Sequence, residues 1–319
     1  MILWNIAGWQ MSPYAGFIWI GCIAAMAVFL WQGRRLRPLS LLCTAVLGTA
    51  LGLLCARAYY VLARLELFLE IGLNQFFRAS DEELAAWGSA KGAAFWGAVG
   101  GVCLGALCAG KITKERVSSL LDALAPAAAL GIAISRFGEF SIGEGIGPEV
   151  TPEGLRFFPL AVVNEWGEWN YALFLLEGLV GLVIFLLLVT RGAEKRDGYR
   201  ARMFLCLYAS CQIVLEAMRR DNFLRWLFVR VSMVVSAVVL LGLVVFGVIR
   251  WARRPHGSRM PKGLLILWCV LFLAMVPAVI LLEFAVDKSP TLSVALAYLL
   301  ETVCCAVMGC ATWQICMKN

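Results

Sequence analysis

One stretch of the chain, residues 135–147, gathers residue types that could bind and activate an anionic substrate. In its sequence, SRFGEFSIGEGIG, Arg136 supplies a permanently charged, forked donor that suits a phosphate group. Glu139 and Glu144 could act as acid or base, or could pair with Arg136; a solvated turn that holds an interfacial arginine is the alternative interpretation. Glycine permits unusual backbone angles and the close approach of a ligand. The glycines of this stretch include Gly138 and Gly147.

Three further groups of ionisable or aromatic residues lie near the ends of apolar runs, where charge is costly and often functional. Arg57 precedes Tyr60 in the sequence CARAYY, which either binds a ligand or holds a snorkelling arginine beside interfacial aromatic residues. Glu216 and Arg219 are three residues apart and therefore share one helix face, as part of a site or as an internal ion pair. Tyr14 lies at the mouth of the first apolar run.

These residues are carried by a chain that is too apolar for a soluble domain. Hydrophobic residues make up 61% of its 319 residues, whereas soluble domains average about 45–50%. Several apolar runs have the roughly 20 residues that cross a bilayer as a helix, and they lack the alternation of a membrane β-strand. We therefore predict an all-α polytopic membrane protein with about nine transmembrane helices. The predicted spans lie near residues 15–32, 39–63, 91–110, 117–135, 171–190, 202–218, 229–249, 263–286 and 291–316.

The loops between these spans predict the orientation in the membrane. Each loop assigned to the inner side carries arginine or lysine, whereas acidic residues gather in the outer segments. The positive-inside rule therefore places the amino terminus outside and the carboxyl terminus in the cytoplasm. Arg57, Arg136 and Arg219 then all lie at the outer level, which suggests an anionic lipid headgroup as ligand. The glycine-rich span 91–110 is expected to pack closely against a neighbouring helix.

The sequence divides into a seven-helix membrane core and an appendage. The core covers residues 1–250 and includes two long outer segments, 64–90 and 136–170, and loops of such length are usually functional or disordered. A basic cytoplasmic linker, residues 251–262, leads to two further transmembrane helices in residues 263–319.

Composition disfavours other functional classes. The net charge of +7 does not indicate nucleic-acid binding, because the basic residues lie in short loops between apolar runs, where membrane topology explains them. Most of the twelve cysteines lie within apolar runs, where they behave as small hydrophobic residues, and no CxxC pair occurs. We therefore expect neither a metal site nor a cofactor.

The stretch 135–147 resembles the signature of the prolipoprotein diacylglyceryl transferases. It keeps the arginine, one glycine, the phenylalanine, the glutamate and the final glycine of that signature, at Arg136, Gly138, Phe140, Glu144 and Gly147. Weaker matches follow in the family's order over roughly residues 10–250. They are CARAYY at 55–60, FWGAVGG at 95–101, LDALAP at 121–126, and the positions of Tyr208, Glu216 and Arg219.

The resemblance implies transfer of a diacylglyceryl group from phosphatidylglycerol to the lipobox cysteine of a preprolipoprotein in the bacterial plasma (inner) membrane. It implies catalytic roles for Arg136, Glu144 and Glu139. It implies that the lipid phosphate is contacted by Arg136, Arg57, Arg219, Gly138 and Gly147. It implies supporting roles for Tyr14, Tyr60, Tyr208 and Glu216.

Several family positions differ in this chain. Trp96 replaces the family histidine, Gln212 replaces an arginine, and Glu139 replaces the first signature asparagine. A glutamate beside the phosphate position would repel the lipid unless an arginine neutralises it. A non-catalytic or altered-specificity relative that binds anionic lipid or a membrane partner is therefore the second hypothesis, and a small transporter is the third.

Overall fold

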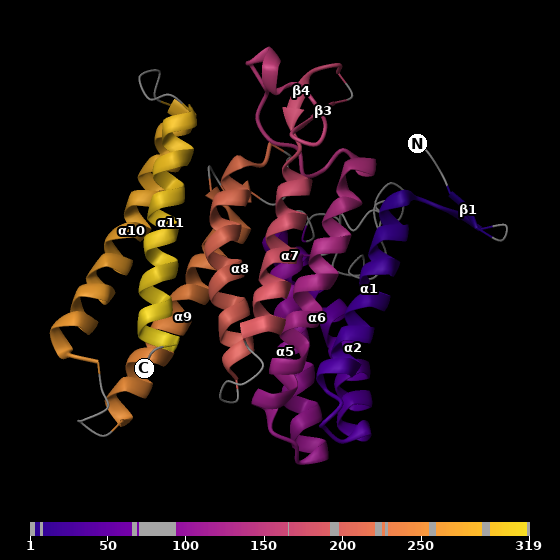
Figure 1. The fold of residues 1–319 in the computed structure, drawn as a ribbon, viewed down its shortest axis with the longest axis vertical. Helices are drawn as coiled ribbons and strands as arrows, with labels where there is room; N and C mark the ends of the chain where they lie inside the picture. The colour runs from indigo at the N-terminus through magenta and orange to yellow at the C-terminus, as the bar shows by residue number, and fades with distance from the viewer. Residues whose placement is uncertain are drawn as a thin grey trace. The chain divides into compact units, whose positions relative to one another are not determined.

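A computed structural model describes residues 4–6, 9–65, 69, 94–164, 166–191, 198–220, 225–226, 229–254, 260–288 and 294–317. The chain divides into two compact units, Met1–Arg200 and Ala201–Asn319, which are described in turn (Figure 1). The predicted outer segment 64–90 falls largely outside the described residues, and the predicted linker 251–262 falls outside them at residues 255–259.

The first unit is a bundle of long helices. Ser12 caps α1, since its hydroxyl accepts the backbone N–H of Ala15 at 3.2 Å. Pro13 and Pro38 begin α1 and α2 at the position where proline is best tolerated in a helix. Packing pairs α1 with α6, α2 with α5, and α6 with α7. The bounds are α1 Pro13–Gln32, α2 Pro38–Ala63, α5 Phe95–Thr113, α6 Val117–Phe137 and α7 Leu173–Arg191.

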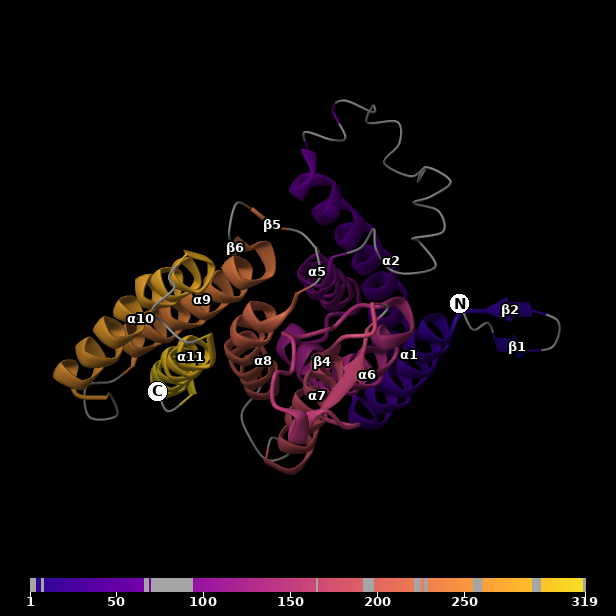
Figure 2. The same cartoon turned by 90° about the horizontal axis from the view of Figure 1, so that it is seen from above.

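Glycines bring α2 and α5 into close contact, as the glycine-rich sequence predicted. The two helices run side by side in Figure 2. A Cβ atom on Gly97 would lie 2.5 Å from the carbonyl oxygen of Cys55, and one on Gly105 would lie 2.5 Å from Cα of Gly48. Any larger side chain at these positions would force the helices apart.

The first unit also contains short β-strands and 3-10 helices. The ribbon of β1 (Trp4–Ile6) and β2 (Trp9–Met11) precedes α1. The loop between α6 and α7 contains the 3-10 helices η2 (Glu139–Ile142) and η3 (Glu153–Leu155). It also contains an antiparallel ribbon in which Val162 of β3 (Ala161–Val163) faces Asn170 of β4 (Trp169–Tyr171). The predicted outer segment 136–170 is therefore an ordered structure.

Hydrogen bonds also fix the end of the first unit. The backbone N–H of Gly198 donates to Oδ2 of Asp122 at 2.6 Å, and Nη1 of Arg200 donates to Oε1 of Gln32 at 2.8 Å. The start of α8 (Tyr199–Met218) is thereby tied to α1 and α6. Asp122 thus binds a backbone N–H of a distant segment.

The second unit contains the rest of α8 and three long helices. Helix α11 packs against both α9 and α10, and Cys206, Leu243 and Cys316 form one of its buried clusters. Gly247 and Gly309 lie at close approaches to Ile315 and Ser210. The bounds are α9 Val231–Arg253, α10 Lys262–Lys288 and α11 Val294–Met317, with a ribbon of β5 (Arg225–Trp226) and β6 (Val229–Arg230).

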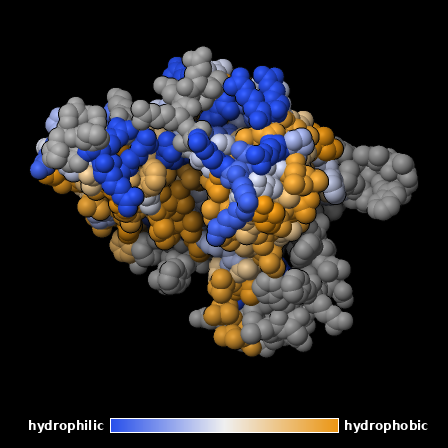
Figure 3. Space-filling view, turned by 90° about the horizontal axis from the view of Figure 1, so that it is seen from below, coloured by the Kyte–Doolittle hydropathy of each residue, from blue (hydrophilic) through white to orange (hydrophobic). Residues whose placement is uncertain are grey.

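The surface is that of a polytopic membrane protein. Within the described residues, nine helices are long and apolar enough to cross a bilayer, which confirms the predicted fold class. Figure 3 looks at the lower ends of the helices in Figure 1: hydrophilic residues gather on the face toward the viewer and hydrophobic residues cover the flanks. The amino-terminus-out orientation and the division into seven helices plus two stay predictions.

Candidate functional site

The carboxyl end of α6 places Arg136 between two acidic side chains. The Nε atom of Arg136 lies 2.9 Å from Oε2 of Glu177, and its Nη1 atom forms an ion pair with Oε1 of Glu139. The three side chains are 12%, 2% and 8% exposed, respectively. We call this group the Arg136 cluster. Charge-assisted hydrogen bonds of this kind fix a guanidinium in one orientation.

Close packing between α6 and α7 brings Glu177 to Arg136. Gly178 follows Glu177, and a Cβ atom there would lie 2.6 Å from Cε1 of Phe137, the residue after Arg136. The missing side chain thus makes room for the phenyl ring where the two helices meet. The sequence marks Glu177 only as an acid within an apolar run, because its partner lies on another helix.

The backbone of the following loop holds Glu139 in place. Gly145 has a positive φ of 67°, which favours glycine. A Cβ atom at this position would lie 2.7 Å from both Oε2 of Glu139 and Cβ of Phe174. The N–H of Glu144 donates to the carbonyl of Glu139 at 3.2 Å, and the N–H of Phe174 donates to the carbonyl of Gly145 at 2.8 Å. The loop therefore closes around the Glu139 carboxylate.

Two glycines expected to contact a phosphate serve the packing of this loop. A Cβ atom on Gly138 would lie 2.8 Å from Cβ of Phe17 on α1, one turn after the buried Tyr14. The N–H of Gly147 donates to the carbonyl of Tyr171 at 2.9 Å, and the side chain of Asn170 donates to the Gly147 carbonyl at 3.1 Å. Direct contact of either glycine with a lipid phosphate stays a prediction.

The charges of the Arg136 cluster limit what it can bind. Arg136 compensates the negative charge of Glu139, as a glutamate at this position requires. Glu177 places a second carboxylate on the same guanidinium. Removing such charges from water is costly unless they are paired. An anionic headgroup that approaches Arg136 must therefore compete with a resident carboxylate.

A second arrangement of cations lies on α2. Cζ of Arg57 lies 5.4 Å from the ring centre of Tyr60, and Cζ of Arg64 lies 5.2 Å from the same ring. Both distances fall within the range of a cation–π interaction. Arg57 and Tyr60 are buried, so Arg57 does not snorkel to the surface. Trp96, which the sequence resemblance matches to a family histidine, is buried at the start of α5.

The second unit contains its own buried polar network. The Nε2 atom of Gln212 donates to Oε1 of Glu216 at 2.8 Å, and Nη1 of Arg230 lies 3.6 Å from Oε2 of Glu216. Nη2 of Arg230 also donates to the backbone carbonyl of Arg219 at 2.7 Å. Arg230 is the last residue of β6, in the ribbon between α8 and α9. The sequence alone did not identify it, because only the spacing of Glu216 and Arg219 indicated an ion pair there. Buried Tyr208 stacks on Phe204 at 5.5 Å between ring centres.

The described residues offer oxygen and nitrogen contacts for a polar headgroup. Among them, no group of three His, Cys, Asp or Glu side chains is placed to hold a metal ion. The Arg136 guanidinium could bind a phosphate in this nearly dry setting, where fixed positive donors act most strongly, only in exchange for one of its two carboxylates.

Comparison with known proteins places these residues in a family context. A family model described as prolipoprotein diacylglyceryl transferase matches residues 1–249. Three relatives carry the name phosphatidylglycerol–prolipoprotein diacylglyceryl transferase. The protein of Shouchella clausii strain KSM-K16 is 30% identical over 216 residues, which cover 65% of this chain and 74% of the relative. That of Halalkalibacterium halodurans is 30% identical over 267 residues, covering 78% and 86%. That of Bacillus cytotoxicus is 30% identical over 255 residues, covering 75% and 88%.

Proposed function

Because the chain belongs to the prolipoprotein diacylglyceryl transferase family, we propose that it transfers a diacylglyceryl group from phosphatidylglycerol to the lipobox cysteine of a preprolipoprotein. The acceptor sulfur forms a bond to the glycerol carbon while the bond from that carbon to the phosphate oxygen breaks. Glycerol phosphate leaves, and the thiol proton passes to a base of the enzyme. The proposal places this reaction at the outer face of a bacterial plasma membrane.

The observation that carries this proposal is the position of Arg136. It lies in the signature-like stretch, at the end of α6, with its guanidinium held in a nearly dry environment. A fixed cation in such an environment stabilises negative charge as it develops on a leaving phosphate. Arg136 would therefore bind the phosphate and stabilise its departure.

The two carboxylates of the Arg136 cluster would have different roles. Glu177 contacts Nε and is the more deeply buried, so it would set the orientation of the guanidinium throughout. Glu139 contacts Nη1 and begins a short 3-10 helix. The substrate phosphate, which is also an anion and has similar acceptor geometry, would displace Glu139 from Nη1. It would therefore act as an internal competitor for the lipid.

Glu144 is the proposed base for the cysteine thiol, since a thiol must lose its proton to become a nucleophile. Its side chain is half-buried at the end of the loop that encloses Glu139. Arg57 with Tyr60, and Arg219, would contact the lipid headgroup. Supporting roles are proposed for Tyr14, Tyr208 and Glu216.

A second candidate function is lipid binding without transfer. Two features favour it: Trp96 and Gln212 occupy positions where the family has a histidine and an arginine, and Arg136 is already matched by two carboxylates. Such a protein would bind phosphatidylglycerol or a membrane partner but form no product.

One experiment separates the two functions. Purified protein is mixed with labelled phosphatidylglycerol and a lipobox peptide, and the thioether product is measured by mass spectrometry. We expect product from the natural sequence and none from Arg136→Ala. The matched control is Arg156→Ala, a half-buried arginine of the same loop that donates to backbone carbonyls and takes no part in the ion pairs of the cluster. Absence of product where a family relative turns over would overturn the transferase proposal. Retained binding of the lipid would then support the second function.

A further inference from the structure

One end of the first unit carries a group of exposed cations on two short turns, at its lower end in Figure 1. The turn between α1 and α2 contributes Arg34, Arg35 and Arg37, and the end of α5 with the turn after it contributes Lys111 and Lys114. The sequence places a single acid, at position 115, within these two segments. We call the five residues the basic surface.

Leu36 packs the two turns together. Its side chain packs against one apolar cluster that contains Phe29 of α1, and against another that contains Ala109 of α5 and Leu120 of α6. The N–H of Leu36 donates to the carbonyl of Gly33 at 2.7 Å, which fixes the backbone of its turn. The cations of the two turns therefore adjoin each other on an ordered backbone.

Two of these cations occupy positions where the fold favours another residue type. Lys114 has a φ of 55°, in the left-handed region that favours glycine at the end of a helix. Arg37 is the N-cap residue of α2, where Ser, Thr, Asp or Asn stabilise a helix and a positive charge opposes the helix dipole. Membrane topology requires basic residues in these loops but not at these two positions. Unfavourable placement of this kind indicates a binding role.

We propose that the basic surface binds an anionic phospholipid that carries two phosphate groups, one at each turn. Arginine and lysine are the side chains that bind phosphate most strongly, and each turn supplies its own group of them. Exposed apolar side chains adjoin the cations: Leu39 is 62% exposed and Ile112 is 66% exposed. These side chains suit the acyl chains of a lipid, which neither a nucleic acid nor a soluble phosphate would use.

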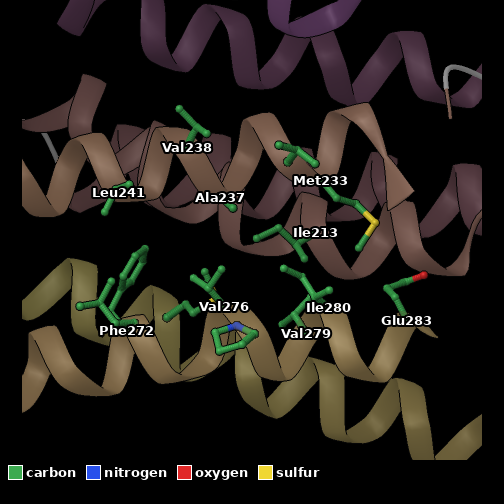
Figure 4. A pocket seen from close by; sticks show the side chains of 14 residues that line it. Ile213, Met233, Ala237, Val238, Leu241, Phe272, Val276, Val279, Ile280 and Glu283 are labelled. Carbon is green, nitrogen blue, oxygen red and sulfur yellow. The ribbon is translucent and has the colours of Figure 1, made fainter. Parts of the chain in front are cut away.

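The hydrophobic pocket of the second unit, shown in Figure 4, is another place where acyl chains could bind. The residues that line it include Val276 and one acid, Glu283, but no arginine or lysine, so the lining offers a phosphate no cation. The basic surface also lies at the opposite end of α6 from Arg136. The inference therefore does not depend on the transferase activity.

The test measures binding of cardiolipin, which carries two phosphates, to the full-length protein in dodecyl maltoside micelles. Cardiolipin is used because phosphatidylglycerol is the proposed substrate of a different site. Titration by native mass spectrometry gives the Kd, and the rise in unfolding temperature gives an independent readout. We expect saturable binding that is at least roughly tenfold tighter than that of phosphatidic acid, which carries one phosphate. Equal binding of the two lipids would overturn the proposal.

Inorganic pyrophosphate distinguishes a lipid from a soluble anion as the ligand. It carries two phosphates but no acyl chain, so it should displace cardiolipin only at concentrations at least roughly a hundredfold higher than unlabelled cardiolipin requires. Displacement at equal concentrations would mean that the basic surface binds a soluble anion, and would overturn the proposal.

Variants locate the binding site. Lys114→Gly removes one charge and the left-handed lysine together. We expect roughly fivefold weaker cardiolipin binding, with an unfolding temperature in the absence of cardiolipin that does not fall. Arg35→Gln should weaken binding by a similar factor. Lys262→Gln, at an exposed lysine of the second unit, is the matched control for loss of one charge, and Val276→Phe is the control for the hydrophobic pocket. Unchanged binding in both Lys114→Gly and Arg35→Gln, or loss of binding in either control, would overturn the proposal.

Discussion

At the scale of single residues, the site is defined by an arginine with two acidic partners. The sequence identifies Arg136, Glu139 and Glu144 as candidates because their types and spacing suit phosphate chemistry. It leaves open whether Glu139 pairs with Arg136, and the structure shows that it does. The contact of Glu177 with Arg136 could not be predicted, because it depends on how α6 and α7 pack.

Replacing Glu139 tests its proposed role as an internal competitor. Glu139→Asn keeps a hydrogen-bond acceptor near Arg136 but removes the competing charge. We expect tighter binding of phosphatidylglycerol and higher transferase turnover at low lipid concentration. Both are measured by titrating labelled lipid in the thioether assay. A lower affinity for the lipid would mean that Glu139 supports substrate binding instead of opposing it.

Replacing Glu177 tests whether it positions Arg136. Glu177→Ala leaves the largely buried guanidinium of Arg136 with one partner fewer, and breaking such a pair costs about 3 kcal/mol of unfolding free energy. We expect a lower unfolding temperature and a lower kcat, with Glu177→Gln restoring part of both. Glu153→Ala, in an exposed part of the α6–α7 loop, is the control. A full kcat in Glu177→Ala would exclude the positioning role.

At the scale of elements, the sequence predicted where the transmembrane helices lie, but it did not predict which helices and strands pack against one another. The predicted span 39–63 corresponds to α2 (Pro38–Ala63), because an apolar run of that length has little alternative to a helix. The predicted span 91–110 corresponds to α5, which begins later, at Phe95. The β3–β4 ribbon was not predicted, because strands of three residues are too short to show an alternating pattern of apolar and polar residues. Backbone hydrogen bonds to Gly147 and Val150, which the sequence does not reveal, stabilise it.

A pair of glycines on α5 tests the tight packing of this helix. Gly105→Ala would place Cβ 2.5 Å from Cα of Gly48 on α2, an overpacking that costs about 1–3 kcal/mol. Gly100→Ala is the matched control, because no atom lies within 4 Å of its added Cβ, and Ala favours a helix by about 0.5–1 kcal/mol. Equal unfolding temperatures of the two variants would contradict the close approach of the helices.

At the scale of the whole molecule, the distribution of charge predicts the topology. The loops before α2 and before α6 carry exposed basic residues such as Arg34, Arg35 and Lys114. The α6–α7 loop, with Glu149, Glu153 and other acids, follows at the opposite end of α6. The positive-inside rule assigns the basic loops to the cytoplasm.

Reporter fusions test this topology. Alkaline phosphatase, which is active only outside the cytoplasm, should be active when fused after Leu155 and inactive when fused after Lys114. Green fluorescent protein at the same two positions should give the reverse pattern, and immunoblots check that the fusions are expressed equally. The opposite result would place the proposed site on the cytoplasmic side and contradict its access to a lipobox cysteine outside.

The resident carboxylate of the Arg136 cluster has one further consequence. If a phosphate replaces Glu139 at the guanidinium, the displaced carboxylate stays on the chain beside it. With its two carboxylates and one guanidinium, the cluster carries one net negative charge before the lipid arrives, so it does not attract an anionic headgroup from a distance. Long-range attraction for the headgroup would then contribute little, and raising the ionic strength would weaken binding only slightly. Discrimination between lipids would rest on the shape of the headgroup and the fit of the acyl chains.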